Sequence, residues 1–311
     1  LGDFRGTISK NAGSMDVSGF EFQLGYNDFE GDFQWSANLN LGTFKNTVKN
    51  LGGAASISGA GFENDNLTRC EVGQPAFFFY GWVFDGIFQS ESEAKTYMDS
   101  TQFKLNASNA GDFRIKDTNG DGIISDADRT NIGIPFPKMN LGLDLNATYK
   151  GFDLNLFISG VYGNKLYNTN IYDLQGMARL FNAGVEVLDR WTPDNPSNTI
   201  PRAGEVGANL RASTRFVENG SYTKLKNITL GYTIPALKNK ITKLRVYVSA
   251  QNMICLTKYS GLDPEVGTYT ANQGVGLIGS PQTSSTNFSN GIDRGNYPIP
   301  KSVIGGFQIT F

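Results

Sequence analysis

Apolar and polar residues alternate strictly along several stretches of the chain. In the stretch FQWSANLNL, residues 33–41, the odd positions carry Phe, Trp, Ala and Leu, whereas the even positions carry Gln, Ser and Asn. The side chains of a β-strand point alternately to its two faces. The pattern therefore predicts a strand with one apolar face and one polar face.

The same alternation recurs along the chain, and short turns join its copies in pairs. Residues 18–26 lead through a turn at 27–32 into the strand at 33–41, and a tight turn at Lys150 and Gly151 joins a second pair. A third turn is expected over residues 235–243. Together with the end of the chain, the pattern predicts seven complete strands, at 18–26, 33–41, 139–149, 152–160, 227–234, 244–252 and 303–311.

The segments between these hairpins are long. Residues 48–137, 164–221 and 258–301 are rich in Gly, Asn, Ser and Pro and show little periodicity. Long loops at one end of a sheet and short turns at the other are typical of an outer-membrane β-barrel. A β-sandwich alternates too, but its solvent face usually carries Lys and Glu, whereas the polar positions here are mostly small and uncharged. We therefore expect an all-β fold, an antiparallel transmembrane barrel wall with long extracellular loops, and keep the sandwich as the alternative.

Composition excludes several classes of function. The 311 residues include no His, which excludes catalysis by imidazole and the commonest metal ligand. The formal net charge of −2 provides no basic field for a nucleic acid partner. The sequence contains no run of about 18 apolar residues, so it predicts no transmembrane helix. Cys70 and Cys255 are a single pair in a long chain, and two unpaired cysteines are the favoured interpretation.

One helix is predicted, in the first long loop. It occupies the stretch SESEAKTYMDS, where Ser90 and Glu93 have the spacing of a capping box. We expect a short helix that packs against the loop around it.

The stretch DTNGDGIISDAD, residues 117–128, has the spacing of an EF-hand calcium loop but lacks the flanking helices. Gly122 allows the sharp turn at the sixth position. The expected ligands are side-chain oxygens and one backbone carbonyl, from Asp117, Asn119, Asp121, Ile123 (carbonyl) and Asp128. An Asp at the twelfth position, where Glu is usual, predicts weak affinity. The alternative is a turn whose Asp and Asn side chains bind only the backbone.

No catalytic site is predicted. Asp263 and Glu265 form an acid pair, but two neighbours on a loop do not define the carboxylate separation that a glycoside hydrolase needs. Trp191 lies in a Pro-rich segment with Arg190, Asp194 and Arg202. Contact with a sugar is one interpretation of this group, and folding of the loop around Trp191 is the favoured one.

Several phrases, in this order, resemble one family. They are FFFYGWVFDGIFQSESEA (77–94), the long block 117–160, DRWTPDNPSNTIPR (189–202), FVENGSYTKLKNITLGYTIP (216–235), LRVYVSAQNMICLTKYSGLDPEV (244–266) and the final YPIPKSVIGGFQITF. These blocks resemble the C-terminal barrel region of the SusC/RagA family, TonB-linked outer-membrane transporters of Bacteroidota. The last strand, which includes Phe307, Ile309 and Phe311, is similar to the last strand of that family.

This resemblance implies the architecture of the whole protein. Family members are several times longer and place a plug domain inside a 22-stranded barrel, and neither the plug nor the N-terminal barrel strands are found in this sequence. We therefore expect residues 1–311 to be the C-terminal part of such a barrel, held by the rest of the protein. The opening LGDFRGTISK has no initiator Met, so we expect a mature chain or an internal piece of a longer one.

The resemblance also implies function and partners. It implies import of oligosaccharides or peptides across the outer membrane, driven through TonB, with a SusD-like surface lipoprotein as a lid and outer-membrane lipid around the barrel. No enzymatic activity is expected. The alternative from the residues alone is a secreted, calcium-stabilised β-sandwich that binds carbohydrate.

Overall fold

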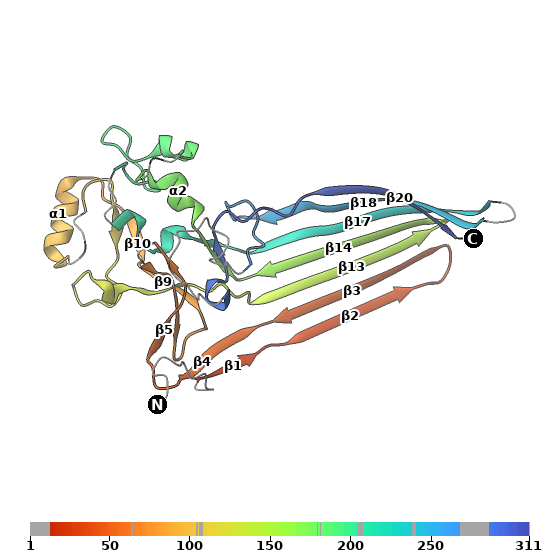
Figure 1. Ribbon diagram of the computed structural model, residues 1–311, viewed down its shortest axis with the longest axis horizontal. Coiled ribbons are helices and arrows are strands. Elements are labelled where there is room, and N and C mark those ends of the chain that lie inside the picture. Colours follow the sequence, from red (N-terminus) through yellow and green to blue (C-terminus); the bar gives the residue numbers. More distant parts are fainter. Residues whose placement is uncertain are drawn as a thin grey trace, which may run out of the picture.

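The computed structural model describes residues 13–63, 65–103, 105, 108–178, 180, 182–204, 208–237, 241–267 and 286–310. Its main feature is one long sheet of seven antiparallel strands, with a lobe of loops and short elements at one end (Figure 1). The sheet order follows the chain: β2 (Glu21–Asp28), β3 (Phe33–Thr43), β13 (Met139–Tyr149), β14 (Phe152–Tyr162), β17 (Tyr222–Leu237), β18 (Ile241–Thr257) and β20 (Ser302–Thr310). The predicted all-β class is confirmed.

The short turns lie at the end of the sheet that is opposite to the lobe (Figure 1). Lys150 and Gly151 both adopt positive φ angles, 45° and 89°, as a two-residue hairpin turn requires. They leave Tyr149 paired with Phe152, and β13 and β14 stay in register over their full length. This turn is the one that the sequence predicts.

The β17–β18 hairpin is longer than the sequence predicts. Pro235 pairs with Lys243 and Leu237 with Ile241, so the strands continue through most of the expected turn. The prediction of a turn over 235–243 is therefore wrong in its length. Proline lacks an N–H and weakens the ladder at its position, but the neighbouring pairs continue the hairpin.

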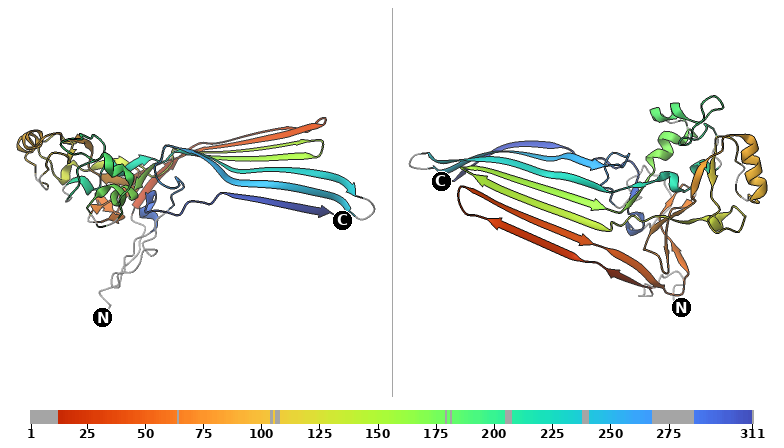
Figure 2. Two further views of the ribbon diagram at one scale, coloured as in Figure 1. Left: turned by 90° about the horizontal axis from the view of Figure 1, so that it is seen from above. Right: turned by 180° about the vertical axis from the view of Figure 1, so that it is seen from behind.

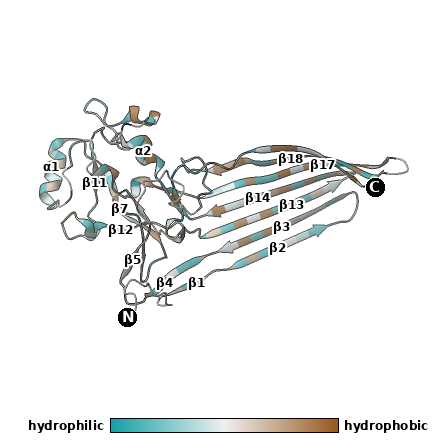
Figure 3. Cartoon of the chain, viewed as in Figure 1, coloured by the Kyte–Doolittle hydropathy of each residue, from teal (hydrophilic) through white to brown (hydrophobic). Residues whose placement is uncertain are grey.

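Side-chain parity, shifted by one residue at a bulge between Leu225 and Asn227 of β17, separates the sheet into two faces. Opposite partners form one apolar row across six strands: Leu24, Leu39, Leu143, Ile158, Leu225 and Ile254. A second row on the other face is entirely polar: Asn27, Ser36, Asn146, Asn155, Thr229 and Ser249. We call these the apolar face and the polar face. Figure 3 shows the resulting change of hydropathy along the strands.

The apolar face is uncovered among the described residues. Leu24 is 55% exposed, Val248 55% and Phe307 72%, values that a water-soluble core would not allow. In a β-sandwich these side chains would pack against a second sheet. The structure therefore contradicts the sandwich and has the exposure pattern of a wall that faces lipid.

The lobe is built from the three long segments between the hairpins. β1 (Gly13–Ser18) and β4 (Lys45–Leu51) pair beyond the end of β2 and β3. A four-stranded sheet contains β5 (Ser56–Ser58), β8 (Thr68–Glu71), β9 (Phe78–Gly81) and β12 (Thr130–Gly133), and a three-stranded sheet contains β15 (Lys165–Asn168), β16 (Val217–Asn219) and β19 (Ile292–Asp293). Two further sheets are strand pairs: β10 (Phe84–Ile87) with β11 (Phe113–Ile115), and β6 (Gly61–Phe62) with β7 (Asp65–Asn66). The helices are α1 (Glu91–Ser100) and α2 (Asn170–Gly176), and the 3-10 turns are η1 (Asp126–Asp128), η2 (Val185–Asp189), η3 (Ala208–Leu210), η4 (Thr214–Phe216) and η6 (Thr286–Ser289).

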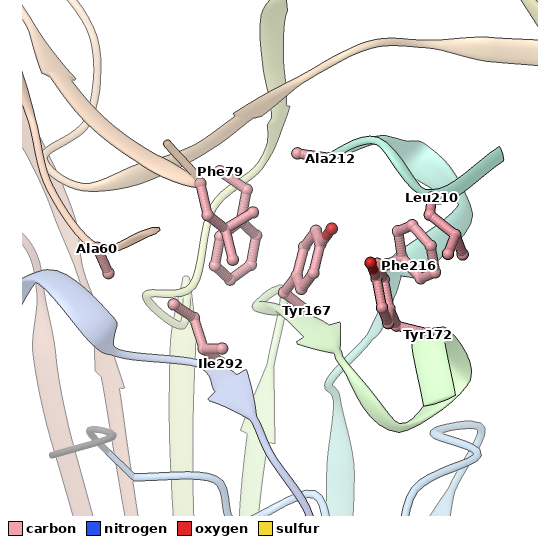
Figure 4. Close-up of a cluster of buried hydrophobic side chains, with 9 residues drawn as sticks. Ala60, Phe79, Tyr167, Tyr172, Leu210, Ala212, Phe216 and Ile292 are labelled. Carbon is pink, nitrogen blue, oxygen red and sulfur yellow. The ribbon is translucent and has the colours of Figure 1, made fainter. Parts of the chain in front are cut away.

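The lobe has a true hydrophobic core, which brings distant segments together (Figure 4). Phe79, Tyr167 and Phe216 are fully or almost fully buried, and the Tyr167 ring lies 5.8 Å from Phe79 and 5.6 Å from Phe216. Burial of each such ring stabilises the fold by about 1.5–3 kcal/mol. The long segments are therefore packed against one another, and the two views of Figure 2 show the lobe beside the end of the sheet.

Several smaller predictions are resolved in the lobe. The predicted helix is α1, and the Ser90 side chain caps it by accepting a hydrogen bond from the backbone N–H of Glu93. Trp191 is 8% exposed and donates from Nε1 to Gln89, so its role is to pack the loop.

Cys70 and Cys255 are both free. Phe311 lies outside the described residues. No helix in the described part of the chain is long and apolar enough to cross a membrane.

The assignment of the faces predicts opposite effects of one charge at two adjacent positions. Leu39 belongs to the apolar face and Asn40 to the polar face. In the whole receptor in lipid bilayers, Leu39→Arg should destabilise the folded barrel by about 2–4 kcal/mol, because it places a guanidinium in hydrocarbon. Asn40→Arg is the matched control and should cost much less. Denaturant titration of the refolded proteins measures both, and an equal loss in the two variants would contradict the assignment.

Candidate functional site

The polar face carries a continuous hydrogen-bonded belt across four strands. Asn155 on β14 donates from Nδ2 to Asn146 Oδ1 on β13 at 2.8 Å and accepts a hydrogen bond from Asn227 on β17 at 2.7 Å. Ser249 on β18 donates to Asn227 Oδ1 at 3.0 Å. Because each side chain holds the next, the belt has few free rotamers and presents a fixed polar surface.

An ion pair crosses this face over a glycine. Arg245 on β18 donates from Nε and Nη2 to the two carboxylate oxygens of Asp153 on β14, at 2.8 and 2.5 Å. The strand between them carries Gly231 at that level, where an added Cβ would lie 2.5 Å from Asp153 Oδ1 and 2.6 Å from Arg245 Nη2. The absence of a side chain at Gly231 therefore makes the bidentate pair possible.

A second charged group attaches the segment after β18 to the sheet. Lys224 Nζ lies 2.6 Å from Asp263 and 3.0 Å from Glu265, and Lys226 Nζ lies 2.5 Å from Glu265. The Tyr222 hydroxyl donates to Glu265 at 2.9 Å. Burial opposes ionisation of the two acids, but the hydrogen bonds from the lysines hold the pKa of Asp263 and that of Glu265 below their ordinary values. Both carboxylates are occupied by cations, an arrangement that anchors a loop.

The five predicted calcium ligands lie in one loop that ends in η1. Asp117 accepts hydrogen bonds from the backbone N–H of Gly120 at 2.6 Å and of Gly122 at 2.8 Å, and the Gly122 amide holds the pKa of Asp117 below its ordinary value. Asp121 accepts from the N–H of Ile123 at 2.7 Å. Gly122 has a φ of 75°, as the sharp turn at this position requires.

The twelfth position closes the loop. Asp128 is fully buried and accepts hydrogen bonds from the backbone N–H of Thr118 at 2.9 Å and of Ser125 at 2.8 Å. These bonds hold the two ends of the loop together, while Asn119 accepts from the N–H of Asp121 at 2.9 Å. Among the described residues, no three acidic, thiol or imidazole side chains converge as a metal centre. The loop is thus folded through its own backbone amides.

Comparison with known proteins gives a consistent picture. No family model matches the chain. TonB-dependent receptor P26 of Formosa agariphila is 31% identical over 97% of this chain and 30% of its own length, and receptor P3 of the same organism is 30% identical over 100% of this chain and 30% of its own. TonB-dependent receptor SusC of Bacteroides thetaiotaomicron is 25% identical over 99% of this chain and 28% of its own length.

Solved structures agree on the fold. The RagAB peptide transporter superposes with a TM-score of 0.71 at 23% identity, over 97% of this chain and 30% of that one. Its open-open state gives a TM-score of 0.72, over 96% of this chain and 29% of that one.

The fold and the two faces define a class of protein, the outer-membrane β-barrels. Within that class, the chain is similar over nearly its whole length to TonB-dependent receptors of the SusC/RagA type, as the sequence resemblance predicts. The predicted location in the bacterial outer membrane is confirmed by these relatives. The chain spans 30% of the length of the first two relatives. All of these relatives carry the names of receptors and transporters, not of enzymes.

The anchor of Asp263 and Glu265 predicts a specific pH dependence. Their ordinary pKa values are 3.8 and 4.5, and both are lowered in the fold. The anchor is therefore at full strength above these values and is lost as the pH falls through the lowered ones, below about pH 4. A spin label at the exposed position 262, on the whole receptor, should be equally restrained at pH 7 and pH 5 and become mobile only at a pH below the ordinary values of the two acids.

Lys224→Met should release the same label already at pH 7, because it removes the cation that both acids share. Lys301→Met is the control and should change nothing. A label that becomes mobile between pH 7 and pH 5 in the wild type would contradict the lowered pKa values.

Proposed function

We propose that the chain forms part of the wall of a TonB-dependent importer, with its apolar face against outer-membrane lipid and its polar face toward the lumen. The observation that carries the proposal is the pair of six-residue rows, one apolar and one polar, that lie back to back across the same strands. An unpaired Asn in hydrocarbon costs several kcal/mol, so the polar row requires a hydrated or protein-filled interior.

The remainder of the barrel and the plug are part of this proposal. β2 and β20 each pair on one side only within the described sheet. An open strand edge inside a bilayer leaves backbone N–H and C=O groups unpaired, which lipid does not tolerate. Residues 1–311 would then be the C-terminal part of the barrel, and the missing strands would pair with both edges.

The proposed substrates are oligosaccharides or peptides, and the proposed partners are TonB and a SusD-like surface lipoprotein. Support comes from the relatives: one is named SusC, and the superposed RagAB structure is that of a peptide transporter. The lobe lies at the end of the sheet that is opposite to the short turns, which in a barrel of this kind is the extracellular end. Its packed surface would meet the lipoprotein.

Calcium binding by the loop 117–128 is the second part of the proposal. The donor set of Asp117, Asn119, Asp121, Asp128 and the Ile123 carbonyl consists of oxygens alone, the ligand type that Ca²⁺ prefers. Each carboxylate oxygen that accepts one N–H keeps a second lone pair, so the hydrogen bonds of the folded loop leave room for a metal. The loop ends already meet at Asp128. Bound calcium would offset the repulsion among three carboxylates and stiffen the loop.

Uptake by whole cells tests the import function. Cells that express the complete receptor with its neighbouring lipoprotein should accumulate labelled oligosaccharides or labelled peptides, and removal of TonB should abolish the accumulation. A receptor with its polar belt broken by Asn155→Leu, which removes hydrogen bonds to two neighbouring strands, should be slower while still reaching the membrane. Accumulation that is unchanged without the receptor or without TonB would contradict the proposal.

Calorimetry tests the calcium loop in the purified receptor. Asp121→Ala removes one charged ligand and should weaken calcium affinity about tenfold, the effect of roughly 1.4 kcal/mol. Asp126→Ala is the matched control, because Asp126 lies in the same loop outside the ligand positions. Chelation should speed proteolysis of this loop in the wild type and in the control. Equal affinity in both variants would exclude the site.

A further inference from the structure

Three arginines and two aromatic rings alternate in a row that begins on the four-stranded sheet of the lobe and continues beyond its strands. The guanidinium groups of Arg69 and Arg129 each lie 4.5 Å from the centre of the Tyr80 ring. Arg129 and Arg211 each lie 4.7 Å from the Trp82 ring. The order Arg69, Tyr80, Arg129, Trp82, Arg211 concentrates three positive charges within one short stretch of surface, which we call the arginine ladder.

The acidic residues near the ladder do not neutralise it evenly. Arg69 lies 3.3 Å from Glu71, and Arg211 lies 3.6 Å from Asp65 and 3.9 Å from Asp126. Arg129, the central member, has no carboxylate within 4.0 Å among the residues that the structure describes. Burial, the main cause, lowers the pKa of Arg129. The more distant carboxylates of Asp65 and Asp126 partly oppose this shift. An anionic ligand in direct contact would offset more of the desolvation cost of this guanidinium.

Hydrogen bonding leaves donors available on both arginines that face Tyr80. Arg129 uses Nη2 to donate to the carbonyls of Asn66 and Tyr80, at 2.5 and 3.2 Å. In the described part of the chain, the buried Nε of Arg129 has no hydrogen-bond partner, whereas the Nε of Arg69 is ion-paired with Glu71. A guanidinium has five N–H donors, so the backbone contacts of Arg129 use only a fraction of its capacity.

A hollow of about 210 Å³ lies between these two arginines and the strands β8, β9 and β12. Its lining includes Arg69, Arg129, Glu71, Gln74, Tyr80 and Asn131, and most of it is polar. The carboxylate of Glu71 is already paired with Arg69 at 3.3 Å. Arg211 is outside the lining. Sites for whole drug-sized molecules are usually 300–1,000 Å³, so this hollow suits a single chemical group.

We propose that this hollow binds one oxyanion, a carboxylate or a sulfate, from outside the cell. Guanidinium groups bind such oxyanions through paired N–H donors, and the amides of Gln74 and Asn131 add further donors at the rim. The site goes beyond the proposed import function and does not depend on it. It fits an acidic group on an extracellular ligand, or the free inorganic anion, through the same chemistry.

Titration calorimetry on the complete receptor in detergent tests the site without transport. Sodium sulfate and sodium acetate are the probes, and sodium chloride at equal ionic strength is the background. The wild type should bind at least one of the two oxyanions saturably. Arg69→Gln should weaken that binding about tenfold, the effect of losing one charge-assisted hydrogen bond.

Arg211→Gln is the matched control, because it removes the ladder arginine that does not line the hollow. It should bind as the wild type does. Arg129→Lys keeps the charge but loses the planar donor fork, and it should also weaken binding. Thermal unfolding of each variant separates lost binding from lost folding. The proposal is overturned if the wild type binds neither oxyanion, or if Arg69→Gln and Arg211→Gln bind equally well.

Two oligosaccharides with the same backbone, one sulfated and one neutral, then identify the source of the oxyanion. If the sulfated oligosaccharide binds more tightly than sulfate itself, and Arg69→Gln loses that binding, the oxyanion is a group carried by a larger ligand. Binding of sulfate with no preference between the oligosaccharides assigns it to the free anion.

Discussion

The whole structure depends on the backbone pairing of seven strands, because lipid offers no partner for an unpaired N–H or C=O. Register follows from that pairing, and register fixes side-chain parity. A shift of one residue in any strand would turn its leucines toward the interior and its asparagines toward lipid. The eleven-residue strands β13 and β14 pair at every position from Met139 to Tyr149, so the two faces stay separate over the full strand length.

The polar face uses the same register for a different purpose. Because opposite partners are adjacent in space, the amides of Asn146 and Asn155 meet and form one belt. Gly231 allows Arg245 and Asp153 to pair across an intervening strand. The lysines at the start of β17 then hold a loop segment about forty residues further along the chain. One face thus carries both the interior surface of the wall and the attachment of the lobe.

Local signals explain what the sequence predicts well. Strand alternation, the Lys150 and Gly151 turn and the Ser90 cap each depend on residues within a few positions of one another. The lobe depends on long-range packing. No periodic pattern in the sequence predicts that Phe79 packs against Tyr167 or that Arg129 stacks on Trp82. Likewise, no local pattern predicts the ion pair between Lys224 and Asp263. The sequence predicts a shorter β17–β18 hairpin because a proline usually ends a strand, whereas pairing continues on both sides of Pro235 here.

The most direct test of the central claim is the environment of successive side chains along one strand. In the complete receptor, with Cys70 and Cys255 replaced, single cysteines at positions 141 to 147 on β13 would carry a nitroxide label in turn. Collision with oxygen, which concentrates in lipid, should peak at the odd positions, and collision with a water-soluble nickel complex should be higher at the even positions wherever water reaches the interior. An oxygen profile with no period of two, or with its maxima at the even positions, would contradict a lipid-facing wall with a polar interior.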